Sequence, residues 1–116
     1  MDTFTLKSGT NKGNRRIWIE GNRLADLGLT RGRTLTRTML DDGTMNLTTG
    51  AGANGKRHRI AGTAERPILD LCGKWVTEFM GDYTHFEVEV VPIYVDGDVD
   101  TAVMVDLYIT PVHRLA

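Results

Sequence analysis

Two stretches of the chain decide its fold: residues 17–24, IWIEGNRL, and residues 69–76, LDLCGKWV. They begin 52 residues apart, and each places apolar residues at alternate positions before a glycine, Gly21 or Gly73. A further apolar residue follows three positions after that glycine in both stretches. Alternate apolar positions indicate a half-buried strand, and the glycine indicates a turn into the next element. The two stretches therefore predict an internal repeat.

The segments that follow each stretch continue in the same order. Apolar spacings of three and four predict a short helix over Arg23–Leu27 in the first half and another around residues 75–80 in the second. A hairpin with an Asp-Gly turn follows in the first half, over residues 34–49. In the second half, the strand Phe86–Val91 alternates apolar and acidic residues, and a long hairpin follows over Tyr94–Thr110.

A unit of about 35 residues buries too little apolar surface to fold alone, whereas two interlocked copies share one core. We therefore expect a single domain over residues 1–116, built from two repeats at about 16–49 and 67–112 and preceded by an N-terminal arm. The expected fold is a β-rich α+β domain, a small pseudo-twofold barrel that is closed or nearly closed, with two short helices. The predicted core consists of Ile17, Ile19, Leu24, Leu27, Leu47, Leu69, Leu71, Val76, Phe79, Phe86, Val88 and Val90.

Composition indicates a soluble globular protein. Hydrophobic residues make up 41% of the 116 residues and charged residues 25%, which are ordinary values. No apolar run approaches the roughly 18 residues that a membrane span needs, and no secretory signal is visible. The single cysteine, Cys72, excludes an internal disulfide. We expect a cytoplasmic protein of a bacterium or a phage-infected host, with no membrane partner.

Charge is divided unevenly between the halves, although the net charge is −1. Residues 1–60 contain eleven Lys and Arg against five Asp and Glu, and arginine outnumbers lysine eight to three. Unless folding interleaves the two halves, this surplus predicts salt-sensitive contacts to nucleic-acid phosphates, for which the planar guanidinium is well suited. The predicted nucleic-acid-binding residues are Arg15, Arg16, Arg23, Arg31, Arg33, Arg37, Lys56, Arg57 and Arg59.

Residues 61–116 are acidic, with ten Asp and Glu against three Lys and Arg. If the strands that carry these acids pair, their carboxylates form a negative surface opposite the basic one, and this surface would steer encounter with a basic protein. Two tyrosines beside the acids are the predicted apolar anchors. The predicted protein-contact residues are Glu87, Glu89, Tyr94, Asp96, Asp98, Asp100, Asp106 and Tyr108.

The sequence offers little for catalysis or cofactor binding. Residues 50–56, GAGANGK, match part of a phosphate-binding loop, but Arg57 stands where that loop needs Ser or Thr to hold magnesium. The three histidines lack metal-ligand spacing, and Cys72 has no nearby base in the sequence. We therefore expect no enzyme, no cofactor and no metal.

Residues 24–32, LADLGLTRG, together with the strand before them and the hairpin after them, resemble the SymE-like half of the AbrB/MazE swapped-hairpin superfamily. Residues 67–112 carry a poorer copy, in which Phe79-Met80-Gly81-Asp82 replaces the glycine stop and the last hairpin is longer. The whole chain is similar to small tandem proteins of phages and mobile elements. The superfamily includes DNA-binding regulators, antitoxins and a toxin-like protein, so the resemblance implies the fold more firmly than one function.

These observations favour a non-enzymatic nucleic-acid-binding or regulatory module that acts through its arginine-rich half. The alternative is a phage-encoded inhibitor of a host defence system, of the anti-CRISPR or anti-restriction type, that acts by contact with a basic host protein or defence complex. A structural or oligomerisation domain, including a homodimer, stays open at this point.

Overall fold

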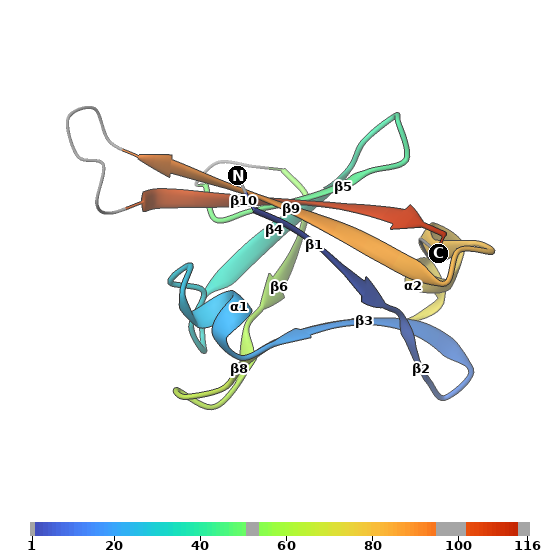
Figure 1. The fold of residues 1–116 in the computed structure, drawn as a ribbon, viewed down its shortest axis with the longest axis horizontal. Helices are drawn as coiled ribbons and strands as arrows, with labels where there is room; N and C mark the ends of the chain where they lie inside the picture. The colour runs from blue at the N-terminus through green and yellow to red at the C-terminus, as the bar shows by residue number, and fades with distance from the viewer. Residues whose placement is uncertain (1, 51–53, 95–101, 114–116) are drawn as a thin grey trace.

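The computed structural model describes residues 2–50, 54–94 and 102–113, which form two antiparallel sheets and two short helices (Figure 1). Sheet A has six strands, in the order β1 (Asp2–Lys7), β9 (His85–Tyr94), β10 (Ala102–Val112), β5 (Met45–Thr48), β4 (Thr34–Met39) and β6 (Lys56–Arg59). Sheet B has four, in the order β2 (Gly9–Asn11), β3 (Asn14–Glu20), β8 (Pro67–Cys72) and β7 (Ala61–Gly62). The helices are α1 (Asn22–Ala25) and α2 (Lys74–Met80). The β-rich α+β class predicted from the sequence is confirmed.

The order of elements in the first half, β1-β2-β3-α1-β4-β5, is repeated in the second as β6-β7-β8-α2-β9-β10. The strand order of each sheet is symmetrical about its centre. In sheet A, β1, β9 and β10 on one side correspond to β6, β4 and β5 on the other, and in sheet B, β2 and β3 correspond to β7 and β8. At the centre of sheet B, Trp18 lies directly opposite Asp70, the residue 52 positions later. Sheet A brings the halves together in the same way, because β1 pairs with β9 and β6 pairs with β4.

The chain passes from one sheet to the other at two corners, Ser8 between β1 and β2 and Ile60 between β6 and β7. At the first corner the Ser8 N–H donates to the carbonyl oxygen of Thr84, and at the second the Ile60 N–H donates to that of Arg33. These bonds continue the register of sheet A by one residue, after the Lys7–His85 pair at the first corner and after the Arg59–Thr34 pair at the second. The fully closed form of the expected barrel is wrong for the described residues, whose ladders form two separate sheets.

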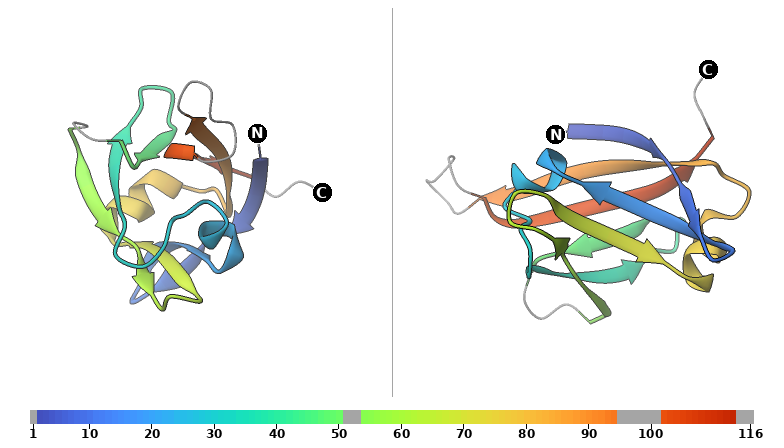
Figure 2. Two further views of the ribbon diagram at one scale, coloured as in Figure 1. Left: turned by 90° about the vertical axis from the view of Figure 1, so that its left-hand side faces the viewer. Right: turned by 90° about the horizontal axis from the view of Figure 1, so that it is seen from below.

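The N-terminal residues that the sequence analysis assigned to an arm lie in β1 and β2. Residues 2–7 pair with β9 along their whole length, and residues 9–11 pair with β3. In the end-on view of Figure 2, the two sheets surround the interior, and α1 and α2 lie toward opposite ends of the molecule in Figure 1.

The core lies between the sheets. Of the predicted core residues, all are buried except Leu27 and Phe79, which pack against the core while partly exposed. Leu29 and Ile60 are also buried although they lie in connecting segments. The remaining buried hydrophobic residues that were not predicted are Leu35, Met45, Met80, Val105, Leu107 and Ile109.

Both helices begin at a glycine that the repeat predicted. Gly21 precedes α1 with φ of 76°, and Gly73 precedes α2 with φ of 135°. Residues that carry a side chain rarely adopt a positive φ of this size, so the turn from strand to helix requires glycine in both halves. The backbone oxygen of Gly21 accepts from Leu24 and Ala25, and that of Gly73 accepts from Val76 and Thr77.

We expect the contact between Leu47 and Leu107 to couple the two halves energetically. These buried side chains lie directly opposite each other where β5 pairs with β10. Leu47→Ala and Leu107→Ala should each lower the free energy of unfolding by about 2–5 kcal/mol, measured by urea denaturation. The double variant should lose less than the sum of the two single losses by about 0.5 kcal/mol or more, because both changes open the same space.

The control is Thr5→Ala at an exposed position, which should stay within about 0.5 kcal/mol of the wild type. Additive losses at the two leucines would contradict a shared core.

Candidate functional site: a basic edge and a half-buried cationic cluster

Five of the nine predicted nucleic-acid-binding residues gather at one edge of sheet A. Strand β6 is the edge strand, and it pairs with β4 so that Arg59 lies opposite Thr34 and Arg57 opposite Thr36. The turn before β4 is tied to the same place, since the Gly32 N–H donates to the Ile60 oxygen over 2.8 Å. We call this group the basic edge; its residues are Arg31, Arg33, Lys56, Arg57 and Arg59.

All five side chains of the basic edge are exposed. Within the described part of the chain the ion pairs are Arg16 with Asp70 and Arg66 with Glu20, so none of the five is neutralised by a carboxylate. Arg33 does donate to the carbonyl oxygen of Gly28 over 3.2 Å. The edge therefore presents uncompensated positive charge from two chain segments.

The other four predicted cations make other contacts: Arg15, Arg16 and Arg37 are half-buried, and Arg23 is exposed on α1. Arg15 donates to the hydroxyl of Ser8 and to the carbonyl oxygens of Gly81 and Tyr83, so it ties β3 to the turn after α2. Arg16 forms two 2.8 Å bonds with the Asp70 carboxylate and lies over the Trp18 ring. The hydrogen bond with Asp70 raises the pKa of the Arg16 guanidinium above its ordinary value. Folding has thus interleaved part of the basic half with the acidic half.

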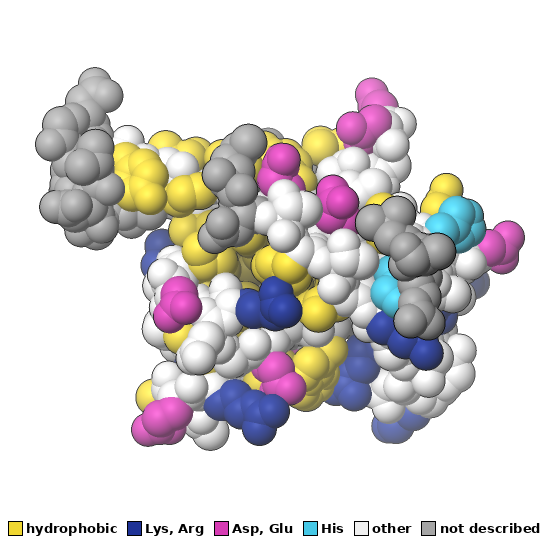
Figure 3. Space-filling view, in the orientation of Figure 1, with side chains coloured by type: hydrophobic (Ala, Val, Ile, Leu, Met, Phe, Trp, Pro, Cys, Tyr) yellow, Lys and Arg dark blue, Asp and Glu magenta, His cyan; other side chains and the backbone are white. Residues whose placement is uncertain are grey.

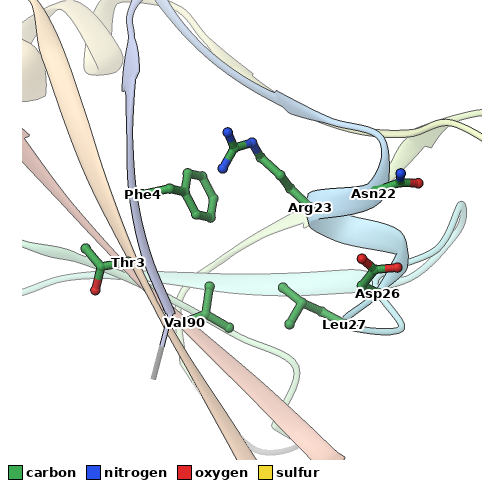
Figure 4. A pocket seen from close by; sticks show the side chains of 7 residues that line it. All are labelled: Thr3, Phe4, Asn22, Arg23, Asp26, Leu27 and Val90. Carbon is green, nitrogen blue, oxygen red and sulfur yellow. The ribbon is translucent and has the colours of Figure 1, made fainter.

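Arg23 lies over a groove between α1 and the free edge of β1. Its guanidinium carbon is 4.4 Å from the centre of the Phe4 ring. The groove has a volume of about 290 Å³, and Figure 4 shows the side chains around it. Its lining consists of Thr3, Phe4, Asn22, Arg23, Asp26, Leu27 and Val90.

Arg37 faces inward toward α2. Its guanidinium carbon lies 3.5 Å from the centre of the Trp75 ring, and the His58 ring centre lies 5.6 Å from that of Trp75. Lys56 pairs with Arg37 across the β4–β6 ladder, two positions along from the pair formed by His58 and Leu35. Both Nη1 of Arg37 and Nε2 of His58 are buried, and neither has a hydrogen-bond partner among the described residues. We call Arg37, Lys56, His58 and Trp75 the cationic cluster.

Electrostatics in the cationic cluster favour a neutral His58. Burial lowers the pKa of His58 below 6.5, and the positive charges of Arg37 and Lys56 lower it further. Burial also lowers the pKa of the Arg37 guanidinium. His58 and Trp75 are not among the site residues predicted from the sequence. The signal was the alternation within β6, which directs His58 to the face opposite Arg57 and Arg59.

The acidic residues predicted for protein contact share one face of sheet A. Where β9 pairs with β10, Glu89 lies opposite Tyr108, Glu87 opposite Thr110 and Asp106 opposite Val91. Their neighbours along the strands, such as Val88 and Leu107, point into the core, so this face is turned outward. We call Glu87, Glu89, Asp106 and Tyr108 the acidic strip. One oxygen of Asp106, Oδ1, is buried without a partner.

The acidic strip and the basic edge belong to the same sheet, and three to four strand spacings along that sheet separate β10 and β9 from β6. Tyr94 is 46% exposed at the far end of β9, beside the 37% exposed Ile93, and Figure 3 shows hydrophobic side chains there next to the grey atoms. Asp96, Asp98 and Asp100 lie outside the described residues.

No protein-family model, no curated protein and no solved structure matches this chain. Among the residues that the structure describes, no three His, Cys, Asp or Glu side chains come together as metal ligands. None of the helices in the described ranges is long and apolar enough to cross a membrane.

The lowered pKa of His58 predicts a loss of stability on mild acidification. Below about pH 6.5 the unfolded chain takes up a proton at this histidine before the folded protein does, so the free energy of unfolding falls as the pH drops toward the folded pKa. Urea denaturation between pH 7.5 and 5.5 should show this fall. His58→Gln should flatten the profile, whereas His85→Gln, on β9, should leave it in place. Equal slopes for wild type and His58→Gln would contradict a neutral buried His58.

Proposed function

We propose that this protein binds nucleic acid through the basic edge. The proposal rests on five cations that gather at the β6 edge of sheet A and have no carboxylate partner among the described residues. They are Lys56, Arg57 and Arg59 on β6 and Arg31 and Arg33 in the turn before β4. Arginine forks form paired hydrogen bonds with phosphate oxygens, and each neutralised phosphate releases counterions. The ligand is thus a phosphate backbone, read with little dependence on base sequence.

The acidic strip restricts how such a ligand approaches. A duplex that lay flat across sheet A would bring its phosphates over Glu87, Glu89 and Asp106. Like charges repel, so the ligand meets the sheet at the β6 side and not across its centre. With a net charge of −1 there is no broad positive field, and binding depends on these few contacts.

Removal of charge from the basic edge should reduce the salt dependence of binding. We expect wild-type affinity for a short B-form DNA duplex to fall as salt is added. Arg57→Gln with Arg59→Gln should weaken binding at low salt and lower the magnitude of the slope of log K against log [salt] by about 1.8, or 0.9 for each lost phosphate contact. Fluorescence anisotropy with a labelled duplex measures both quantities.

A matched double variant tests whether the effect is local. Lys7→Gln with Lys12→Gln removes the same charge from exposed positions on and beside β1 and β2, away from β6. This variant should keep the wild-type slope. Equal losses in the two variants would show a response to net charge alone, and no binding of duplex or single-stranded nucleic acid by the wild type at low salt would reject the proposal.

We also infer that the two halves are related by a pseudo-twofold axis in a swapped-hairpin arrangement, as the AbrB/MazE resemblance implies. Support comes from the repeated order of elements, the symmetrical strand orders of both sheets and the pairing of Trp18 with Asp70. The paired corners at Ser8 and Ile60 extend the correspondence back to β1 and β6. The repeats thus begin before residues 16 and 67.

A second candidate function rests on the acidic strip. The alignment of Glu87, Glu89 and Asp106 beside Tyr108 offers a surface for a basic protein, as an inhibitor of a host defence complex would need. Co-purification from an expressing host should retain a basic partner with the wild type and lose it with Glu87→Gln and Glu89→Gln. Retention of the same partners by both proteins would leave the acidic strip without a role in binding.

A further inference from the structure

The cationic cluster contains two buried polar nitrogens that the fold leaves without acceptors, Nη1 of Arg37 and Nε2 of His58. A buried donor without an acceptor is costly, and native proteins almost always satisfy such groups with protein, water or a bound ion. Both side chains lie beside the same ring, that of Trp75. Their shared position suggests one acceptor for both.

The charge of the cluster indicates what that acceptor is. Arg37 and Lys56 are cationic, and neither takes part in an ion pair among the described residues. A water molecule accepts hydrogen bonds but leaves this charge in place, whereas an oxyanion accepts from both nitrogens and neutralises it.

The first half of the chain shows that the fold does not require polar groups at these positions. At the offset of 52 residues, His58 corresponds to Leu6 and Lys56 to Phe4, and both of these pack against the core. Trp75 corresponds to Arg23, and each half has one contact between an arginine and an aromatic ring at this place. In the first half Arg23 lies over Phe4, and Arg23 has no buried nitrogen without a partner among the described residues. Polar residues that replace apolar ones at corresponding positions point to a function.

We propose that Arg37 and His58 form a binding site for one phosphate group beside Trp75, with Lys56 at its outer side. In the tautomer that carries a proton on Nε2, His58 donates one bond, and Arg37 donates another through Nη1. The site itself rests on the cluster alone; the further step, that a nucleic-acid phosphate fills it, rests on the proposed function. Lys56 links the two, since it belongs to both the basic edge and the cluster.

Inorganic phosphate is the first probe. In a Trp18→Phe background Trp75 is the only tryptophan, so its emission reports on the site. Phosphate should change this emission saturably and raise the pKa of His58 measured by NMR, because the bound anion stabilises the imidazolium. Arg37→Gln should weaken phosphate binding about tenfold or more. Arg23→Gln, which removes the cation of the corresponding contact over Phe4, should leave it unchanged.

The NMR measurement needs no variant at Arg37, so a folding defect in Arg37→Gln does not block the test. An unchanged His58 pKa at saturating phosphate would overturn the site. So would equal phosphate affinities in Arg37→Gln and the parent, or a chloride salt of equal ionic strength that reproduces the response.

Oligonucleotides with and without a 5′-phosphate distinguish the sources of the phosphate. A stronger His58 and Trp75 response to the phosphorylated strand places a terminal phosphate in the site, and equal responses place a backbone phosphate there. Binding of oligonucleotides with no response at His58 or Trp75 overturns this inference and leaves the basic edge intact. A response to inorganic phosphate without any oligonucleotide binding supports the site and rejects the proposed function.

Discussion

The structure depends on the exchange of strands between the two halves of the chain. Strand β1 of the first half pairs with β9 of the second half, and β6 of the second half pairs with β4 of the first. The same exchange brings Ile17 and Ile19 against Leu71 and Leu69 in sheet B. Apolar burial across this boundary joins the two halves into one core.

The exchange also places the charged groups. Because β6 belongs to the second half but pairs with β4 of the first, Arg57 and Arg59 meet Arg31 and Arg33 at one edge. Because β10 lies between β9 and β5, the acids of the second half occupy the middle of the sheet. The division of charge along the sequence thus becomes a division along sheet A, with the acids on β9 and β10 and the basic edge at β6.

Local signals predicted the parts of this fold that local chemistry controls. Gly21 and Gly73 mark both helix starts, and the alternation around Val88 gave the correct inward face. Ile60 and Leu29 escaped prediction because isolated apolar residues in connecting segments have no period. The inward direction of Arg37 was also hidden, because its face follows from pairing with Lys56 and from Trp75, both distant in the sequence. The division into two sheets follows from pairing between distant strands, such as β1 with β9 and β3 with β8, which no local sequence pattern encodes.

The symmetrical pairing of the halves has a consequence for how the chain folds. Sheet B is complete only after residues 48–56 positions apart have met, and sheet A only after residues 58–88 positions apart have met. Loop closure therefore comes before most of the gain in stability, and folding should be slow for a domain of this size. A second copy of the chain offers the same strands with the same registers. At high protein concentration we therefore expect refolding chains to exchange halves, with every strand keeping its neighbours in the resulting dimer.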